Sequence, residues 1–364
     1  MRYFSILLLT SYFFHLPPSS KPSTYIWDMK EVDTLAMKPT SQAYKALVKK
    51  ADDLVGQEPI SVTDKSICIS GDKHNYESLA TYYWPDPNNP QGQYISKDGQ
   101  TNPETNRYDF PRLLKLNEIC TYLGRAFYIT RDIKYHAALC NYLDAWFVSK
   151  STRMNPSMEY SQFIPRFNEN KGMPGGVLDA YRFVDVIESI MLVDQIKSIG
   201  WLRRKKLKKW FGDLAEWMID SPNGQKASKK LNNHAIAYYG TLLEIALFTN
   251  DHLLQQKAID GFILNVDKQI EKNGKMPQEL SRTKAFTYSI FNLSHIIDCY
   301  AMAKNSGIEI PDTTKKRIQD AAIYLSSFVG KKESFPYKEI GQWERQEKNL
   351  DRVLRRMVQL ELRK

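Results

Sequence analysis

The chain has 364 residues, enough to bury a large core, and its 42% hydrophobic and 25% charged residues exclude a disordered or low-complexity protein. Its 51 Lys and Arg residues outnumber the 41 Asp and Glu residues, which gives a net charge of +10. This excess favours an acidic partner, which could be nucleic acid, anionic lipid or a polyanionic glycan.

The N-terminus has the pattern of a secretory signal peptide. Arg2 precedes an apolar run over 4–14, and a Pro-Pro-Ser-Ser segment follows. The run is too short to span a membrane, and no later stretch approaches 18 uninterrupted apolar residues. We therefore expect a signal peptide over 1–20 and an exported protein over 21–364, periplasmic or secreted, without a membrane span. Export counts against a nucleic-acid partner and favours a glycan.

Most of the remaining chain has helical periodicity. Apolar residues recur three and four apart, as in the stripe that contains Leu113, Leu116 and Cys120. Connections are mostly short, so neighbouring helices are expected to be antiparallel in a single all-α domain. The charged segment from Glu333 is expected to be a lid or a frayed tail. The expected helices cover 41–55, 111–127, 137–147, 177–196, 202–219, 231–248, 252–270, 287–303 and 315–328.

Two long irregular stretches, 67–111 and 150–176, interrupt the helices. Both are rich in Pro, Asn, Gly and aromatic residues. Long ordered loops of this kind usually carry function. The basic run over 203–209 lies beside an apolar helical face, so it is interpreted as a solvated helix surface.

The sequence contains no local metal-binding motif. Cys68, Cys120, Cys140 and Cys299 form no close pair of the redox or zinc type, and no two histidines are four residues apart. The cysteines are expected in the core, where free thiols are common. Spacing alone leaves a disulfide between Cys120 and Cys140 open.

The first segment with candidate site residues is the loop over 70–103. Lys73 and His74 can bind carboxylates, and Tyr83 and Trp84 can stack on sugar rings. The same residues are equally compatible with a loop whose aromatic side chains only pack against the helices.

Two further candidate segments lie at helix starts. Asn232, Asn233 and His234 open one apolar helix, where amide and imidazole groups can meet a carboxylate. Arg282 is expected in the loop before another helix, and Tyr288 in its first turn, so both can face one cavity. Taken singly, each residue could instead be a helix cap, a surface residue or a core residue.

Together these segments resemble the alginate lyase family of polysaccharide lyases. Asn-Asn-His is followed by Glu-Leu-x-Arg-Thr-x-x-x-x-Tyr-Ser-x-Phe-Asn-Leu over 279–293. The loop motifs Ser-Gly-Asp-Lys-His-x-Tyr, Tyr-Trp-Pro-Asp-Pro and Asp-Gly-x-x-Asn-Pro also match, as do Thr-Arg-Met-Asn-Pro over 152–156 and Tyr-Ser-Gln over 160–162. The resemblance covers residues 60 to 300 in chain order.

The resemblance implies an (α/α) toroid of antiparallel helical hairpins that cleaves a uronate-containing polysaccharide by β-elimination, without a metal or an organic cofactor. It assigns Tyr288 as the acid, with His234, Asn233 and Arg282 around it. Either His234 or, in a syn reaction, Tyr288 would be the base. The residues expected to bind substrate are Lys73, His74, Tyr83, Trp84, Arg153, Asn155, Tyr160, Gln162 and Asn232.

The sequence departs from the family pattern after Gln162. Residues 163–168 and a Lys-Gly pair replace a more Gly-rich stretch that contains an Arg, so Arg166 and Lys171 are the candidate replacements. This divergence leaves alginate, glucuronan and related polyuronates open as substrates. The sequence does not define endo or exo action, or the oligomeric state.

Two other functions remain compatible with the sequence. An (α/α)-barrel glycoside hydrolase would need two carboxylates flanking the scissile bond. The available carboxylates are Asp86, Asp98, Asp109 and Glu279. A non-catalytic protein that binds acidic glycans would need only the basic cleft.

Overall fold

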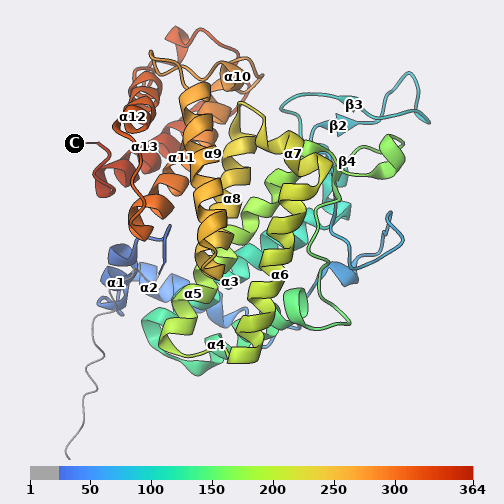
Figure 1. The fold of residues 1–364 in the computed structure, drawn as a ribbon, viewed down its shortest axis with the longest axis vertical. Coiled ribbons are helices and arrows are strands. Elements are labelled where there is room, and N and C mark those ends of the chain that lie inside the picture. Colours follow the sequence, from blue (N-terminus) through green and yellow to red (C-terminus); the bar gives the residue numbers. More distant parts are fainter. Residues whose placement is uncertain (1–23, 364) are drawn as a thin grey trace, which may run out of the picture.

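The computed structural model describes residues 24–363 and is built mainly from helices (Figure 1). The expected signal peptide over 1–20 lies outside the described residues. The α-helices are α1 (Met29–Ala36), α2 (Gln42–Asp52), α3 (Phe110–Thr130), α4 (Ile133–Leu143), α5 (Phe183–Ile196), α6 (Trp201–Asp220), α7 (Pro222–Ser228), α8 (Asn233–Thr249), α9 (His252–Gln269), α10 (Pro277–Leu280), α11 (Ala285–Ser306), α12 (Asp312–Ser326) and α13 (Trp343–Gln359).

Helix α8 lies at the centre of the fold. It packs against α5, α6, α9 and α11, and α3 packs against α4 and α5. Most of α8 is buried, as expected for a helix that is apolar around its circumference and surrounded by other helices. The expected all-α toroid in a single domain is confirmed.

Four short strands order the irregular stretches on one side of the helices (Figure 1). Strand β1 (Glu77–Leu79) pairs in parallel with β4 (Tyr160–Phe163), and β2 (Tyr83–Trp84) pairs antiparallel with β3 (Ile95–Ser96). The first pair joins the two long stretches to each other, so loops far apart in the sequence form one surface.

The C-terminal segment differs from the expectation. Residues 343–359 form helix α13, where Leu350 and Met357 are fully buried. Trp343 stacks on Phe286 of α11, with ring centroids 4.1 Å apart and an interplanar angle of 11°. The expected lid or frayed tail is therefore wrong. The apolar residues that bury one face of α13 are hard to recognise in the sequence, because many charged residues lie between them. Helices α1 and α7 were also not expected, and residues 174–182 form 3₁₀ turns before α5 begins.

The cysteines and the basic run behave as ordinary structural features. All four cysteines are free thiols, so the disulfide left open is not formed. Three of them are buried and Cys68 is half-buried. In the basic run on α6, Arg203 pairs with Asp144 and Lys209 with Asp213, at 2.8 and 2.7 Å.

The two ends of the described chain meet. The Glu188 carboxylate on α5 accepts the backbone N–H groups of Tyr25, Ile26 and Trp27 at 2.7 to 3.0 Å. The Arg356 guanidinium of α13 donates to the Ile26 carbonyl. This closing segment, residues 25–27, joins the N-terminal residues to helices from the middle and the end of the chain.

Candidate active site

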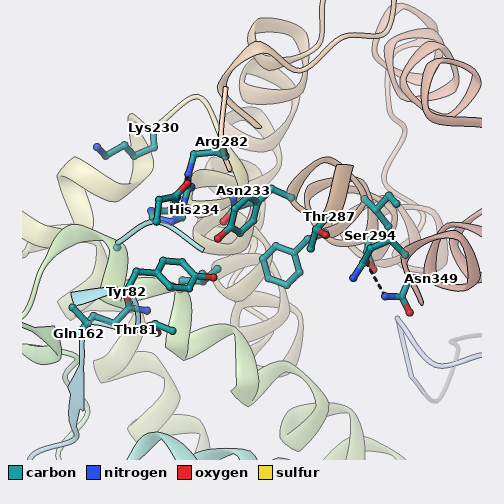
Figure 2. A pocket seen from close by; sticks show the side chains of 18 of the residues that line it. Thr81, Tyr82, Gln162, Lys230, Asn233, His234, Arg282, Thr287, Ser294 and Asn349 are labelled. Carbon is teal, nitrogen blue, oxygen red and sulfur yellow. Dashed lines mark hydrogen bonds and ion pairs between the residues drawn. The ribbon is translucent and has the colours of Figure 1, made fainter. Parts of the chain in front are cut away.

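A cavity of about 1050 Å³ lies where the loop containing β2 and β3 meets the starts of α8 and α11 and one face of α13. Figure 2 shows Lys230, Asn233, His234 and Arg282 on one side of the view, and Thr287, Ser294 and Asn349 on the other. Its polar and aromatic lining residues are Thr81, Tyr82, Tyr83, Ser96, Asp98, Gln162, Lys230, Asn233, His234, Arg282, Thr287, Tyr288, Phe291, Ser294, Arg345, Gln346, Asn349 and Arg352.

The structure brings together the four residues that the sequence proposed for catalysis. Asn233 and His234 lie in the first turn of α8, after the Asn232 cap, whose Oδ1 accepts the His234 N–H at 3.1 Å. Arg282 lies in the connection between α10 and α11, and Tyr288 in the first turn of α11. All four line the cavity.

Arg282 is held by a carboxylate from a distant loop. Its Nε donates to Asp98 Oδ1 at 3.1 Å, and its Nη2 donates to the same atom. The Thr283 backbone N–H and hydroxyl donate to Asp98 Oδ2 at 3.0 and 2.9 Å. Burial alone would raise the pKa of Asp98, but these partners lower it to about 2. Asp98 is therefore a permanent negative partner that orients the guanidinium and leaves its Nη1 without a carboxylate among residues 24–363.

The Tyr288 ring lies under this guanidinium, with the Arg282 Cζ 4.3 Å from the ring centroid. The Tyr288 hydroxyl is buried and has no well-formed hydrogen bond to any described residue. Burial and the neighbouring Tyr82 hydroxyl raise the pKa of Tyr288 well above its usual range, and Arg282 offsets only part of this rise. Tyr288 is therefore a protonated phenol whose O–H has only the Tyr82 hydroxyl beside it and can turn to a ligand.

His234 is a neutral base. Burial, followed by the positive charges of Arg282 and Lys230, lowers the pKa of His234 to about 4. Its Nδ1 is buried without a hydrogen-bond partner among the described residues. A methyl group at Gly175 would lie 3.1 Å from the His234 Cε1, so the glycine allows the backbone to approach the ring closely. The imidazole thus keeps a free acceptor at neutral pH.

Asn233 is oriented by Glu279. The Asn233 backbone N–H donates to Glu279 Oε1 at 2.7 Å, and the amide Nδ2 lies 2.9 and 3.1 Å from the two carboxylate oxygens. Burial raises the pKa of Glu279, and the Asn233 donors counteract part of this effect. This arrangement leaves at most one amide N–H of Asn233 for a substrate.

Gln162 is also held firmly at the cavity wall. Its φ of 51° is in the left-handed region, which costs free energy for a residue with a side chain. Its backbone N–H donates to Ser78 Oγ and its Nε2 to Asp179 Oδ1, both at 2.8 Å. The buried Asp179 also accepts the Ser78 and Tyr76 hydroxyls, so one carboxylate fixes this corner.

Most of the other expected substrate-binding residues do not line the cavity. Only Tyr83 and Gln162 of that set do so. The residues outside it are Lys73, His74, Trp84, Arg153, Asn155, Tyr160 and Asn232. Trp84 donates through Nε1 to the Gln100 carbonyl at 2.9 Å, and Asn232 serves as the α8 cap.

Three of the excluded residues, His74, Arg153 and Asn155, join the two long irregular stretches; we call this group the loop clasp. His74 Nδ1 lies 2.6 Å from the Arg153 carbonyl oxygen. Asn155 donates through Nδ2 to Asp72 Oδ2 and Asn75 Oδ1, at 3.0 and 2.9 Å. His74 Nδ1, Asn155 Nδ2 and the Arg153 carbonyl are therefore used to hold the two stretches together.

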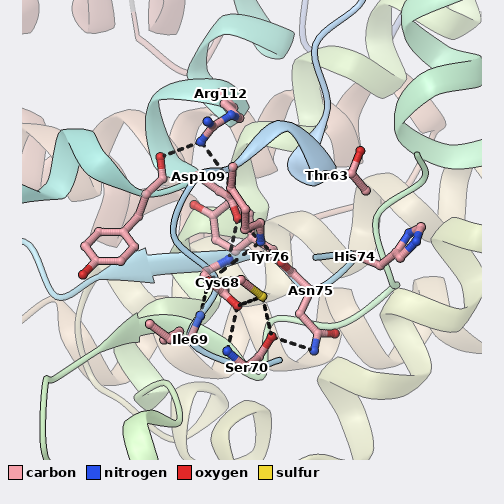
Figure 3. Close-up of polar contacts among 12 residues, drawn as sticks. Thr63, Cys68, Ile69, Ser70, His74, Asn75, Tyr76, Asp109 and Arg112 are labelled. Carbon is pink, nitrogen blue, oxygen red and sulfur yellow. Dashed lines mark hydrogen bonds and ion pairs between the residues drawn. The ribbon is translucent and has the colours of Figure 1, made fainter. Parts of the chain in front are cut away.

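A buried polar cluster holds the first of the two irregular stretches in place (Figure 3). Asp109 Oδ2 accepts the Lys65 ammonium at 2.6 Å and the Glu77 backbone N–H at 3.0 Å. The Glu77 carboxylate accepts the backbone N–H groups of Ile69 and Ser70, each at 3.0 Å. Burial raises the pKa of Asp109 to about 6, although Lys65 counteracts it. These carboxylates are structural.

The divergent loop does not supply replacement cations. Arg166 donates to the Pro90 and Gly92 carbonyls at 2.9 Å, and Lys171 pairs with Glu159 at 3.6 Å. Neither side chain lines the cavity. The expectation that they serve in the site is wrong, because both are used to hold neighbouring loops.

Comparison with known proteins identifies the family. The sequence model of the family described as alginate lyase matches residues 61–335. The chain belongs to the alginate lyase family. An alginate lyase from Bacteroides ovatus has 35% sequence identity and a TM-score of 0.87, over 93% of this chain and 92% of the other. Alginate lyase A1-III from Sphingomonas species A1 has 13% identity and a TM-score of 0.54, over 86% and 79% of the two chains, which shows similarity of fold alone. None of the curated proteins searched matches the chain.

Membership of this family makes the chain a polysaccharide lyase. The four carboxylates considered for a glycoside hydrolase support this conclusion, because each already has a partner within the protein. Asp98 is paired with Arg282, Glu279 with Asn233 and Asp109 with Lys65, while Asp86 accepts the Asn88 N–H at 2.9 Å. Of these carboxylates, Asp98 alone lines the cavity. They therefore do not form the opposed acid and base of a glycosidase.

Sequence reasoning missed several residues of this alginate lyase site. Asp98 and Glu279 were noticed as possible hydrolase carboxylates and as members of family motifs, but not as the partners that orient Arg282 and Asn233. Tyr82 was not singled out. Lys230 gave no signal. Arg345 and Arg352 of α13 could have been found from their spacing of seven residues on a predicted helix, had that helix been expected. Within residues 24–363, no group of three or more His, Cys, Asp and Glu side chains could hold a metal ion.

Proposed function

We propose that the protein cleaves a uronate-containing polysaccharide, alginate or a related polyuronate such as glucuronan, by β-elimination. The proposed product carries an unsaturated uronate at the new non-reducing end. The observation that carries the proposal is a strongly cationic cavity that also contains a neutral imidazole and a phenol, each with a buried polar atom that lacks a well-formed hydrogen bond to the described residues.

The charge of the cavity fits an acidic substrate. Its charged lining consists of the cations Lys230, Arg282, Arg345 and Arg352, with Asp98 as the carboxylate. Because Asp98 is already paired with Arg282, it does not cancel the remaining positive charge. Such a site attracts uronate carboxylates, and Arg282 can form a charge-assisted hydrogen bond with the carboxylate of the reacting sugar. Withdrawing charge from this carboxylate makes the proton on C5 more acidic.

His234 and Tyr288 are placed to move the protons. A neutral His234 can accept the C5 proton, and the protonated Tyr288 can donate to the O4 leaving group. The elimination breaks the C5–H bond and the C4–O4 bond and forms the C4=C5 double bond, so the proton taken and the proton given balance. The neighbouring Tyr82 hydroxyl also raises the pKa of Tyr288 and so favours its protonated form.

A second assignment gives both proton transfers to Tyr288. In that reaction Tyr288 first loses its proton, which the raised pKa of the free site opposes. The configuration at C5 decides whether the abstracted proton and O4 lie on the same or opposite faces of the ring. A same-face reaction suits a single tyrosine, and an opposite-face reaction suits two separate groups.

The experiment uses protein that begins at Lys21, with alginate, polymannuronate, polyguluronate, glucuronan, pectate and glycosaminoglycans as substrates. Ultraviolet absorbance follows the conjugated unsaturated uronate, and a reducing-end assay follows chain cleavage. Rising absorbance is expected with at least one polyuronate. New reducing ends without absorbance would favour the glycoside hydrolase. Binding without cleavage would favour the non-catalytic glycan-binding protein.

We also propose that the protein is exported through residues 1–20. The support is the charged start followed by a short apolar run, together with a polymeric substrate. In the part of the chain that is described, no helix has the length and apolar character needed to cross a membrane. The N-terminal sequence of the protein recovered from cells that express the full precursor tests this proposal, and an uncleaved Met1 would contradict it.

A further inference from the structure

One face of α13 presents a row of polar side chains to the cavity. Arg345, Gln346, Asn349 and Arg352, which we call the α13 stripe, all line it. Their spacing along the helix places them on one side, across two turns. The catalytic groups proposed above come from α8, α11 and the loop between α10 and α11, so this row is a separate part of the wall.

Helix α13 is fixed relative to the proposed acid. The Glu339 carboxylate accepts the Thr287 backbone N–H at 2.8 Å and its hydroxyl at 3.0 Å. The Ala285 N–H donates to the Lys338 carbonyl at 3.0 Å. These bonds tie the segment before α13 to the first turn of α11, where Tyr288 lies. The α13 stripe is therefore a preorganised surface.

The two arginines of the stripe have unused positive charge. Neither Arg345 nor Arg352 forms an ion pair within residues 24–363, and Arg352 Nη1 only donates to Asn349 Oδ1 at 3.3 Å. By contrast, Arg355 on the same helix pairs with Asp351 at 2.8 Å. Arginines that face a cavity without an ion pair are typical of a site that binds an anionic ligand.

We infer that the α13 stripe binds the carboxylates of uronate residues beyond the one whose bond is broken. The inference rests on the proposed function. Seven residues of helix separate Arg345 from Arg352, a rise of about 10 Å along the axis. Two arginines spaced in this way along one helix face can each bind a separate carboxylate of an extended chain. The stripe is therefore suited to a chain that carries several carboxylates.

A subsite of this kind affects binding more than chemistry. Contacts that are equal in the ground state and the transition state change KM and leave kcat unchanged. Two solvent-accessible arginine–carboxylate contacts correspond to a change of about tenfold in KM. Because these contacts are ionic and accessible to solvent, added salt weakens them.

The test compares the double variant Arg345→Gln/Arg352→Gln with the matched control Arg355→Gln, which changes a charge on the same helix outside the cavity. The substrate is whichever polyuronate of the panel the wild type cleaves. We expect KM of the double variant to rise about tenfold and kcat to stay within about twofold. We also expect KM of the double variant to depend less on NaCl concentration than KM of the wild type, and Arg355→Gln to behave as the wild type.

The outcomes separate this inference from the proposed function. A wild type that cleaves polyuronate and a double variant with unchanged KM and salt dependence would overturn the inference alone. An equal rise of KM in Arg355→Gln would also overturn it, since the effect would then come from net charge. A folded wild type that neither binds nor cleaves any polyuronate would overturn the proposed function and this inference with it.

Discussion

The cavity and the loop clasp contain polar residues of the same types, yet they differ in how their polar atoms are satisfied. In the loop clasp, His74 and Asn155 are bonded to other parts of the protein. In the cavity, His234 Nδ1 and the Tyr288 hydroxyl are buried without well-formed hydrogen bonds to described residues.

This difference separates structural from functional polar residues. Leaving a buried polar group unpaired costs about 1–3 kcal/mol, and these two groups line a cavity in which a substrate can supply the missing hydrogen bonds. The partners that orient the site, Asp98 and Glu279, are in contrast fully used. Four variants test the comparison.

The largest effect is expected at Tyr288. Tyr288→Phe removes the proposed proton donor and little contact area, so kcat should fall by at least about a thousandfold. The unfolding free energy should stay the same or rise, since an unsatisfied hydroxyl is lost. Ultraviolet absorbance and thermal unfolding check both values. Wild-type turnover in this variant would remove Tyr288 from the reaction.

Glu279→Gln should have the next largest effect. The new amide replaces a carboxylate that accepts two donors of Asn233, so Asn233 and the adjacent His234 lose their fixed position. We expect kcat to fall by about 10–100-fold, with a smaller change in KM. Asp109→Asn is the control, because it removes a buried carboxylate away from the cavity. If both variants lowered kcat of the folded protein equally, Glu279 would have only a structural role.

The pH dependence of stability should depend on His234. Its pKa of about 4 in the folded protein lies below the value of about 6.5 in an unfolded chain. Between these values the unfolded chain binds a proton that the folded protein does not bind, so stability falls as pH decreases. Relative to the wild type, His234→Gln should lose about 1–2 kcal/mol less between pH 7 and pH 5. Denaturant unfolding measures this, and His252→Gln, at an exposed helix start, controls for removal of an imidazole.

The smallest effect is expected in the loop clasp. Asn155→Ala removes two side-chain hydrogen bonds and should lower the unfolding free energy by about 1 kcal/mol. Turnover of the folded protein should remain within about twofold of the wild type. A tenfold loss of kcat at unchanged stability would place Asn155 in the substrate site and contradict the distinction between the two regions.

The sequence predicted the local parts of this molecule well. Helical periodicity located most of the long helices, and the motif around Arg282 and Tyr288 placed one residue in a loop and the other in the first turn of the next helix. Asn232 and its neighbours were correctly expected at a helix start. These features depend on residues close together in the sequence, where spacing and capping rules apply.

The parts that the sequence did not predict depend on distant contacts. Asp98 meets Arg282 across 184 positions, and Glu279 meets Asn233 across 46. No periodicity relates such pairs. The same limitation explains why His74 and Asn155 were expected at the substrate, since a motif does not reveal whether its polar groups face a cavity or another loop.

The closing segment also has a consequence for the order of folding. Residues 25–27 join α5 and α13, and the bond from Arg356 to Ile26 spans 330 positions. Contacts between residues far apart in the sequence carry a larger loop-closure cost than contacts within a helical hairpin, so we expect them to form later. Residues 25–27 can meet α5 first, but they gain their full set of contacts only after α13 has been synthesised. The contact between the two ends of the described chain is therefore completed only after synthesis has passed α13.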